Sequence, residues 1–130
     1  MTQLVDLAEY NELTHKIIGC AMTVHRKLGR GFLEVVYQRS LATELFKQEL
    51  RAEREIELPV YCEDEKFGSR RVDFFVDGRV VVEIKAASCI LPAYHAQLIN
   101  YLEVFKIPVA LLINFGTPSL EFKRFVKAAK

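Results

Sequence analysis

Two carboxylates and a lysine lie within a short apolar stretch and are the residues of this chain best suited to chemistry. Asp73, Glu83 and Lys85 fall on two expected β-strands that are rich in valine and phenylalanine. Charged side chains inside such strands are costly to bury unless something compensates them. A divalent metal held by Asp73 and Glu83, with Lys85 beside it, would compensate them and form a site that cleaves phosphodiester bonds. The alternative is a surface hairpin with a solvated Glu-Lys face.

The register of the expected hairpin places the two acids opposite each other. Side chains alternate between faces along a strand, and a three-residue loop at residues 77–79 would bring the apolar faces of both strands together. Asp73 then faces Glu83, with Lys85 on the same side. Like charges in facing positions are destabilising, so a cation between them is favoured. A two-residue turn would mix charged and apolar side chains on each face; we therefore expect a three-residue loop or a bulge with Gly78 at positive φ.

Oxygen ligands of this kind suit Mg²⁺, which usually binds one or two carboxylates together with substrate phosphate. Asp73 and Glu83 are the expected ligands, with the Ile84 carbonyl as a further one, and Mn²⁺ would suit the same donors. The metal would polarise the phosphate and activate water. Lys85 would stabilise the developing negative charge, or act as a base if its pKa is lowered.

Composition indicates one soluble α/β domain over residues 1–130, with hydrophobic residues at 51% and charged residues at 27%. The net charge is only +1, which excludes the global basic field of strongly basic nucleic-acid binders. Basic residues do gather near the C-terminus, where Lys123 and Arg124 would either contact substrate phosphates or form a solvated strand face.

Three cysteines without metal-type spacing indicate reduced thiols and a cytoplasmic protein. The first residues lack a signal peptide, and no apolar run reaches membrane-spanning length, so we expect no membrane partner.

The pattern of apolar residues predicts three helices and five strands in a mixed sheet. The strand at residues 109–114 is nearly all apolar, which predicts a strand buried on both faces and paired in parallel through a helical crossover. The expected elements are helices at 5–28, 33–48 and 93–105, strands at 52–62, 70–76, 80–85, 109–114 and 120–126, and a turn at 63–68.

The ordered set of motifs resembles the PD-(D/E)XK nuclease superfamily, and within it the small GxxExxY family. Residues 31–37 (GFLEVVY) fit the name-giving motif, and Asp73 followed by residues 83–86 (EIKA) fits the nuclease motif. Residues 96–102 and 112–116 continue the likeness, which spans nearly the whole chain. Val72 stands where a proline often precedes the first acid. The resemblance implies a restriction-endonuclease-like core, a mixed β-sheet flanked by helices.

The resemblance also implies roles for three helical residues. Glu34 would complete the metal shell or orient a water; without the resemblance it would be an ordinary exposed glutamate. Gln97 and Tyr101 lie four residues apart and share a helix face, where the superfamily often carries a Gln or Tyr directed at the site. The alternative is that Tyr101 packs in the core and Gln97 satisfies a buried polar group.

Two functional classes remain open. The first is a Mg²⁺-dependent nuclease acting on DNA or on RNA. The second is a non-catalytic nucleic-acid-binding or protein-interaction module that retains the nuclease fold, in which the acids and Lys85 form an ion-pair network. A homodimer is compatible with either class, since many nucleases of this fold dimerise to cut both strands.

Overall fold

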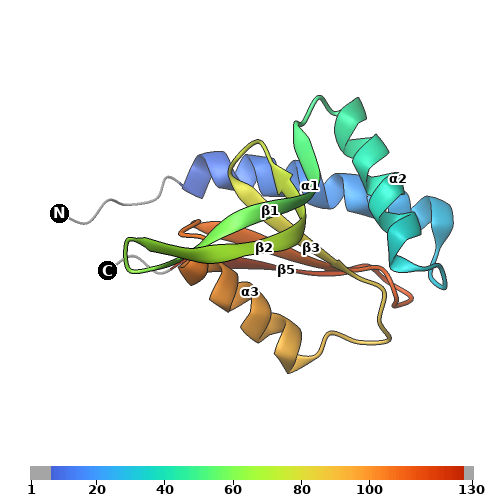
Figure 1. The fold of residues 1–130 in the computed structure, drawn as a ribbon. Helices are drawn as coiled ribbons and strands as arrows, with labels where there is room; N and C mark the ends of the chain where they lie inside the picture. The colour runs from blue at the N-terminus through green and yellow to red at the C-terminus, as the bar shows by residue number, and fades with distance from the viewer. Residues whose placement is uncertain (1–6, 128–130) are drawn as a thin grey trace.

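The structure is a computed structural model that describes residues 7–127. In this part of the chain, three helices pack on a five-stranded sheet, and Figure 1 shows how these elements are arranged. The predicted order of helices and strands is confirmed, as is the mixed α/β class; residues 5 and 6 of the first predicted helix lie outside the described part. The helices are α1 (Leu7–Leu28), α2 (Glu34–Lys47) and α3 (Pro92–Val104). The strands are β1 (Ala52–Cys62), β2 (Glu65–Val76), β3 (Val80–Lys85), β4 (Val109–Asn114) and β5 (Glu121–Val126).

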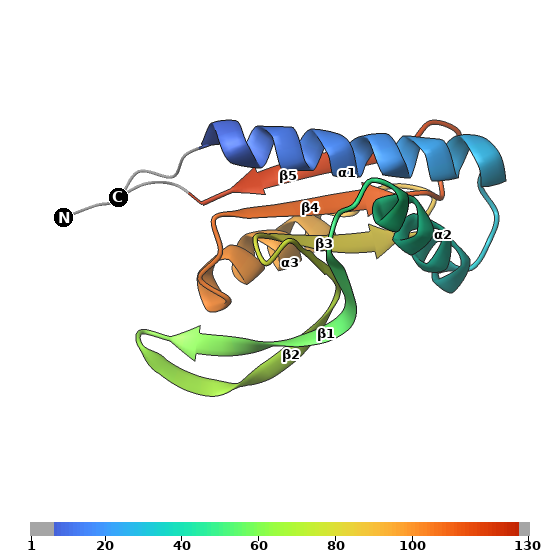
Figure 2. The same cartoon turned by 90° about the horizontal axis from the view of Figure 1, so that it is seen from above.

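The sheet runs in the order β1-β2-β3-β4-β5, and only β3 and β4 are parallel. Helix α3 connects these two strands, which confirms the predicted crossover, and it packs on one face of the sheet while α1 and α2 pack on the other (Figure 2). All six residues of β4 are buried, as expected for a strand covered on both faces.

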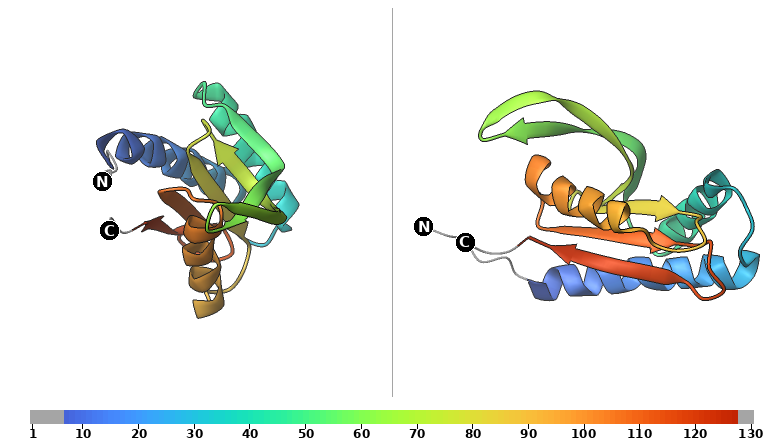
Figure 3. Two further views of the ribbon diagram at one scale, coloured as in Figure 1. Left: turned by 60° about the vertical axis from the view of Figure 1, so that its left-hand side comes forward. Right: turned by 90° about the horizontal axis from the view of Figure 1, so that it is seen from below.

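The β1–β2 hairpin extends beyond the other strands and curves away from the sheet (Figure 3). Here the predicted boundaries were wrong, because β2 begins at Glu65 and not at residue 70. The turn contains only Glu63 and Asp64, since Glu63 takes a left-handed φ of 57°. Gly68, expected in the turn, pairs with Val60 next to a register shift in the hairpin.

The β2–β3 turn has the predicted register. Val76 pairs with Val80 and Phe74 with Val82, so residues 77–79 form a three-residue loop. Gly78 has a φ of 64°, as predicted, and Asp77 shares the left-handed region with a φ of 52°.

One face assignment in this hairpin was wrong. Phe74 belongs to the apolar cluster under α1 and α2, but Val72, two residues earlier, packs in the cluster under α3. The strand pair curves at this point, where Glu55 of β1 takes a φ of 52° between the partners of Val72 and Phe74. Simple alternation along a straight strand does not anticipate such a bend.

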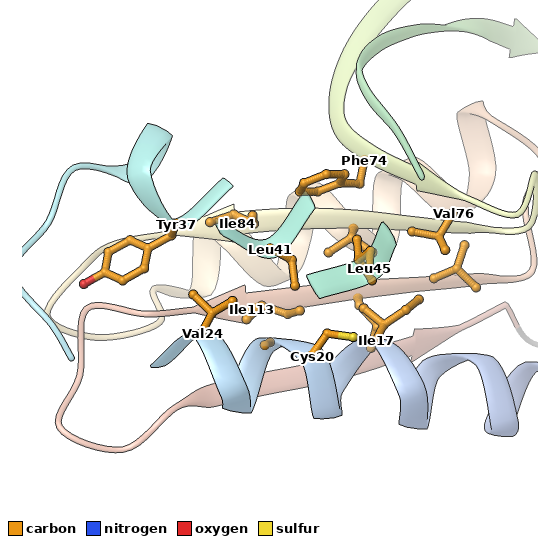
Figure 4. Close-up of a cluster of buried hydrophobic side chains, with 14 of the residues drawn as sticks. Ile17, Cys20, Val24, Tyr37, Leu41, Leu45, Phe74, Val76, Ile84 and Ile113 are labelled. Atoms are coloured by element: carbon orange, nitrogen blue, oxygen red, sulfur yellow. The ribbon is translucent and has the colours of Figure 1, made fainter. Parts of the chain in front are cut away.

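Two hydrophobic clusters hold β3 and β4 in place. Figure 4 shows the larger one, in which Tyr37 and Leu41 of α2 and Ile17 of α1 face Ile84 and Ile113 of the sheet. The other cluster joins α3 to the opposite face through Leu98, Tyr101 and Leu102. Strand β3, which carries Glu83, is therefore clamped from both sides.

Candidate active site

The two acids predicted to face each other lie close together just beyond the Phe74–Val82 pair, where the β2–β3 pairing ends. The Asp73 backbone N–H donates to Glu83 Oε1 at 3.2 Å, and the Ile84 N–H donates to Asp73 Oδ2 at 2.8 Å. Glu83 is buried, with 6% of its surface exposed, whereas Asp73 is half-buried. The β2–β3 register thus produces a carboxylate pair fixed by backbone hydrogen bonds.

Burial and the neighbouring acid both act on Glu83. Loss of hydration, and then the charge of Asp73, raise the pKa of Glu83 from its ordinary value of 4.5 to about 8, while the Lys85 ammonium opposes the rise. A cation at the pair would remove this penalty, and the donors are the oxygen atoms that Mg²⁺ requires. Asp73 and Glu83 therefore fit a divalent metal.

Helix α2 contributes a carboxylate and an amide to the same place. Glu34 is exposed at the start of α2, and partial burial followed by the charge of Asp73 raises its pKa, while Lys85 lowers it. Gln38, one turn later and buried, directs its Nε2 at Asp73 Oδ1 at 3.4 Å. Sequence reasoning missed Gln38, although its spacing of four from Glu34 is the available signal.

Glu34 does not join the two sheet acids in a compact metal cluster. Among residues 7–127, the structure holds no group of three or more His, Cys, Asp or Glu side chains arranged to bind a metal ion. The predicted role of Glu34 in the metal shell therefore stays a prediction, while two carboxylates remain within what Mg²⁺ uses when waters and phosphate supply the other ligands.

Helix α3 borders the opposite side of the pair with one polar face. Lys85 Nζ lies 4.7 Å from the centre of the Tyr94 ring, a contact that the sequence did not predict. Tyr101 is buried, and loss of hydration together with the charge of Glu83 raises its pKa to about 12. Gln97, between them on the helix, has its Oε1 buried without a hydrogen-bond partner in the described part of the chain.

A second cation, Arg70, lies beside this face of α3, and sequence reasoning did not predict it. The Arg70 guanidinium sits 5.3 Å from the centre of the Tyr101 ring, on the ring whose phenol senses Glu83 and Asp73. Nothing in the sequence pattern relates Arg70 to α3, because the contact depends on how the β1–β2 hairpin curves.

Of the basic residues predicted to contact substrate, the structure places Arg124 on the other face of the sheet. Arg124 pairs with Leu111, a residue of the cluster under α1 and α2, and it hydrogen bonds Asn11 of α1. Lys123 pairs with Leu112, which shares the α3 face, and is exposed on the edge strand β5. Arg124 is therefore not brought to the acid pair.

Comparisons with known proteins bear on the family and the fold of this chain. Residues 11–125 match the family model described as the PD-(D/E)XK nuclease superfamily. The crystal structure of a protein named SSO0001 superposes with a TM-score of 0.54 at 22% identity, covering 73% of this chain and 50% of that chain. The chain thus spans half the length of that structure, and the likeness bears on the fold. A search of curated proteins found no match.

In the described residues, no helix combines the length and apolar character needed to cross a membrane.

Proposed function

We propose that this chain, which belongs to the PD-(D/E)XK nuclease superfamily, is a Mg²⁺-dependent nuclease that hydrolyses phosphodiester bonds of DNA. The observation that supports this most is the buried Glu83 beside Asp73. Lys85 follows Glu83 by two residues in β3 and therefore lies on the same face of the strand. The proposal includes the narrower GxxExxY assignment, RNA as an alternative substrate and a cytoplasmic location.

Asp73 and Glu83 would hold the metal, which supplies Lewis-acid activation of water and of the phosphate. Backbone hydrogen bonds from Ile84 to Asp73 and from Asp73 to Glu83 fix both carboxylates before substrate arrives. Such preorganisation is effective because little reorganisation is needed during the reaction.

Lys85 has a defined task in this proposal. Its ammonium is held over the Tyr94 ring at 4.7 Å, near the acid pair, so that it can stabilise negative charge on the phosphate. Gln97, with its free Oε1, is suited to accept a hydrogen bond from the attacking water or from Lys85.

The test combines metal binding with cleavage. Calorimetry with Mg²⁺ and Mn²⁺ compares the wild type with Asp73→Ala and Glu83→Ala, and a cleavage assay on labelled DNA and RNA adds Lys85→Ala. We expect metal binding to be lost in both acid variants, and cleavage to fall by roughly 100-fold or more in all three. Lys66→Ala, an exposed lysine on β2, is the control for removing a positive charge. Cleavage that survives all three substitutions would show that the site lies elsewhere.

A second candidate has one observation in its favour. Both oxygens of Asp73 already accept hydrogen bonds, from Ile84 N–H and from Gln38, as they would in a purely structural network of a non-catalytic binding module. That alternative predicts that Asp73→Asn combined with Glu83→Gln changes stability without changing metal affinity.

A further inference from the structure

We infer that Arg70 is a second phosphate-binding residue, which holds a nucleic-acid backbone phosphate next to the one being cleaved. The inference rests on the proposed nuclease function and adds to it a contact that would make a polynucleotide, and not a small phosphodiester, the preferred substrate. It is carried by the position of Arg70 over α3 and by the distribution of cations around the acid pair.

The curved hairpin brings Arg70 to the site. Arg70 pairs with Leu58 of β1, and Leu58 packs in the cluster under α3. The side chain of Arg70 shares that face of the hairpin, and its guanidinium reaches the Tyr101 ring at 5.3 Å. A residue of the β1–β2 hairpin thereby becomes part of the edge of a site built on β3 and α3.

Arg70 and Lys85 are held in the same manner at two points of one helix. Each cation lies over a tyrosine ring of α3, Arg70 over Tyr101 and Lys85 over Tyr94. The two tyrosines are seven positions apart in α3, which at 1.5 Å per residue separates them by about 10 Å along the helix axis. Arg70 and Lys85 are therefore anchored at different points along α3, and we assign Arg70 to the neighbouring phosphate.

The Arg70 guanidinium has no carboxylate partner that would compete with an anion among residues 7–127. It is exposed, and it forms no ion pair with any carboxylate among residues 7–127, although other arginines of the protein do. Contact with Tyr101, which includes a hydrogen bond from the Arg70 side chain, orders the group. A guanidinium has five N–H donors, so others remain to bind a phosphate. An ordered arginine with no carboxylate partner, placed over the Tyr101 ring at the edge of the site, is suited to phosphate recognition.

Arg71 offers a matched control for the test. It is the next residue on β2, it is also exposed, and it pairs with Glu57, so its side chain lies on the other face of the hairpin. Binding of a labelled single-stranded oligonucleotide is measured in EDTA, where cleavage is prevented, for the wild type, Arg70→Ala, Arg70→Lys and Arg71→Ala.

We expect Arg70→Ala to weaken binding by roughly 10- to 100-fold and to reduce the slope of log K against log salt by about 0.7. Arg71→Ala should change binding by less than about 3-fold, because surface charges far from the ligand act weakly. Arg70→Lys should recover only part of the affinity, since an ammonium lacks the planar fork. Equal losses in Arg70→Ala and Arg71→Ala, or no binding by the wild type, would overturn the inference.

Cleavage assays separate this inference from the proposed function. Bis(p-nitrophenyl) phosphate contains one phosphate, so Arg70→Ala should hydrolyse it within about 3-fold of the wild-type rate while losing activity on the oligonucleotide. Lys85→Ala should lose activity on both substrates. Equal loss on both substrates in Arg70→Ala would place Arg70 at the scissile phosphate and overturn the inference. A wild type that binds through Arg70 but cleaves neither substrate would refute the nuclease function alone.

Discussion

Glu83 should make the metal-free protein less stable as the pH rises from 5 to 8. The folded protein holds the Glu83 proton up to a pKa of about 8, whereas the unfolded chain releases it near the ordinary value of 4.5. Between these values the folded state binds more protons, so the free energy of unfolding falls with rising pH. The stability that the protonated group provides is complete below pH 4.5 and lost once the pH passes 8.

The magnitude follows from the two pKa values. They differ by about 3.5 pH units, and each unit corresponds to ~1.4 kcal/mol, so the free energy of unfolding should fall by about 5 kcal/mol across this range. Glu83 is buried, so screening by solvent reduces this figure little. Glu83→Gln keeps the shape and the acceptor for the Asp73 N–H, and it removes the titration.

The assay is urea unfolding in EDTA at several values between pH 5 and pH 8.5. We expect the stability difference between Glu83→Gln and the wild type to grow with pH in favour of the variant, a comparison in which the titration of groups remote from Glu83 cancels. Glu57→Gln, an exposed acid on β1, serves as the control for a removed carboxylate. At pH 8, Mg²⁺ should restore the free energy of unfolding of the wild type and leave that of Glu83→Gln unchanged. A difference independent of pH would refute the reasoning.

Two further predictions concern Gln38 and Gly116. Gln38→Ala removes the side-chain amide that donates a hydrogen bond to Asp73 Oδ1 at 3.4 Å. The Mg²⁺ affinity measured by calorimetry should therefore fall about 10-fold. An unchanged affinity would show that Gln38 does not orient Asp73. Gly116→Ala would place a Cβ 2.3 Å from the Ala87 carbonyl oxygen, and this backbone clash should lower the free energy of unfolding by about 2 kcal/mol or more. Gly19→Ala, inside α1 with open space around it, should instead raise it by ~0.5–1 kcal/mol. Urea unfolding measures the stability of both glycine variants. Similar changes in the free energy of unfolding for Gly116→Ala and Gly19→Ala would contradict the predicted backbone clash at Gly116.

The acid pair could be predicted from sequence because it depends on local rules. Alternation along a strand and the parity of a three-residue loop are enough to set Asp73 against Glu83, and both strands keep their expected faces near the turn. Lys85 follows from the same alternation. The β3-α3-β4 crossover was equally predictable, because the apolar run of β4 indicates burial on both faces.

The rest of the site depends on how separate elements cross in space. Gln38 reaches Asp73 from α2, and Arg70 reaches Tyr101 because the hairpin curves past Glu55. The same curvature moved Val72 to the cluster under α3. Arg124 was predicted from charge alone, which does not specify a face of β5. No pattern within a single element contains this information.

The fold can accommodate the buried Glu83 carboxylate because its two hydrophobic clusters are large. Strand β3 is buried from Val80 to Ile84 and packs against helices on both faces, and each buried aliphatic side chain contributes about 1.5–3 kcal/mol. The free energy of unfolding of a small domain is only about 5–15 kcal/mol. A loss of about 5 kcal/mol near pH 8 is therefore a large fraction of the total stability. Replacing buried charges with apolar residues of similar volume is often neutral or stabilising. The stability of the metal-free fold therefore does not explain a carboxylate at position 83, whereas a bound cation would.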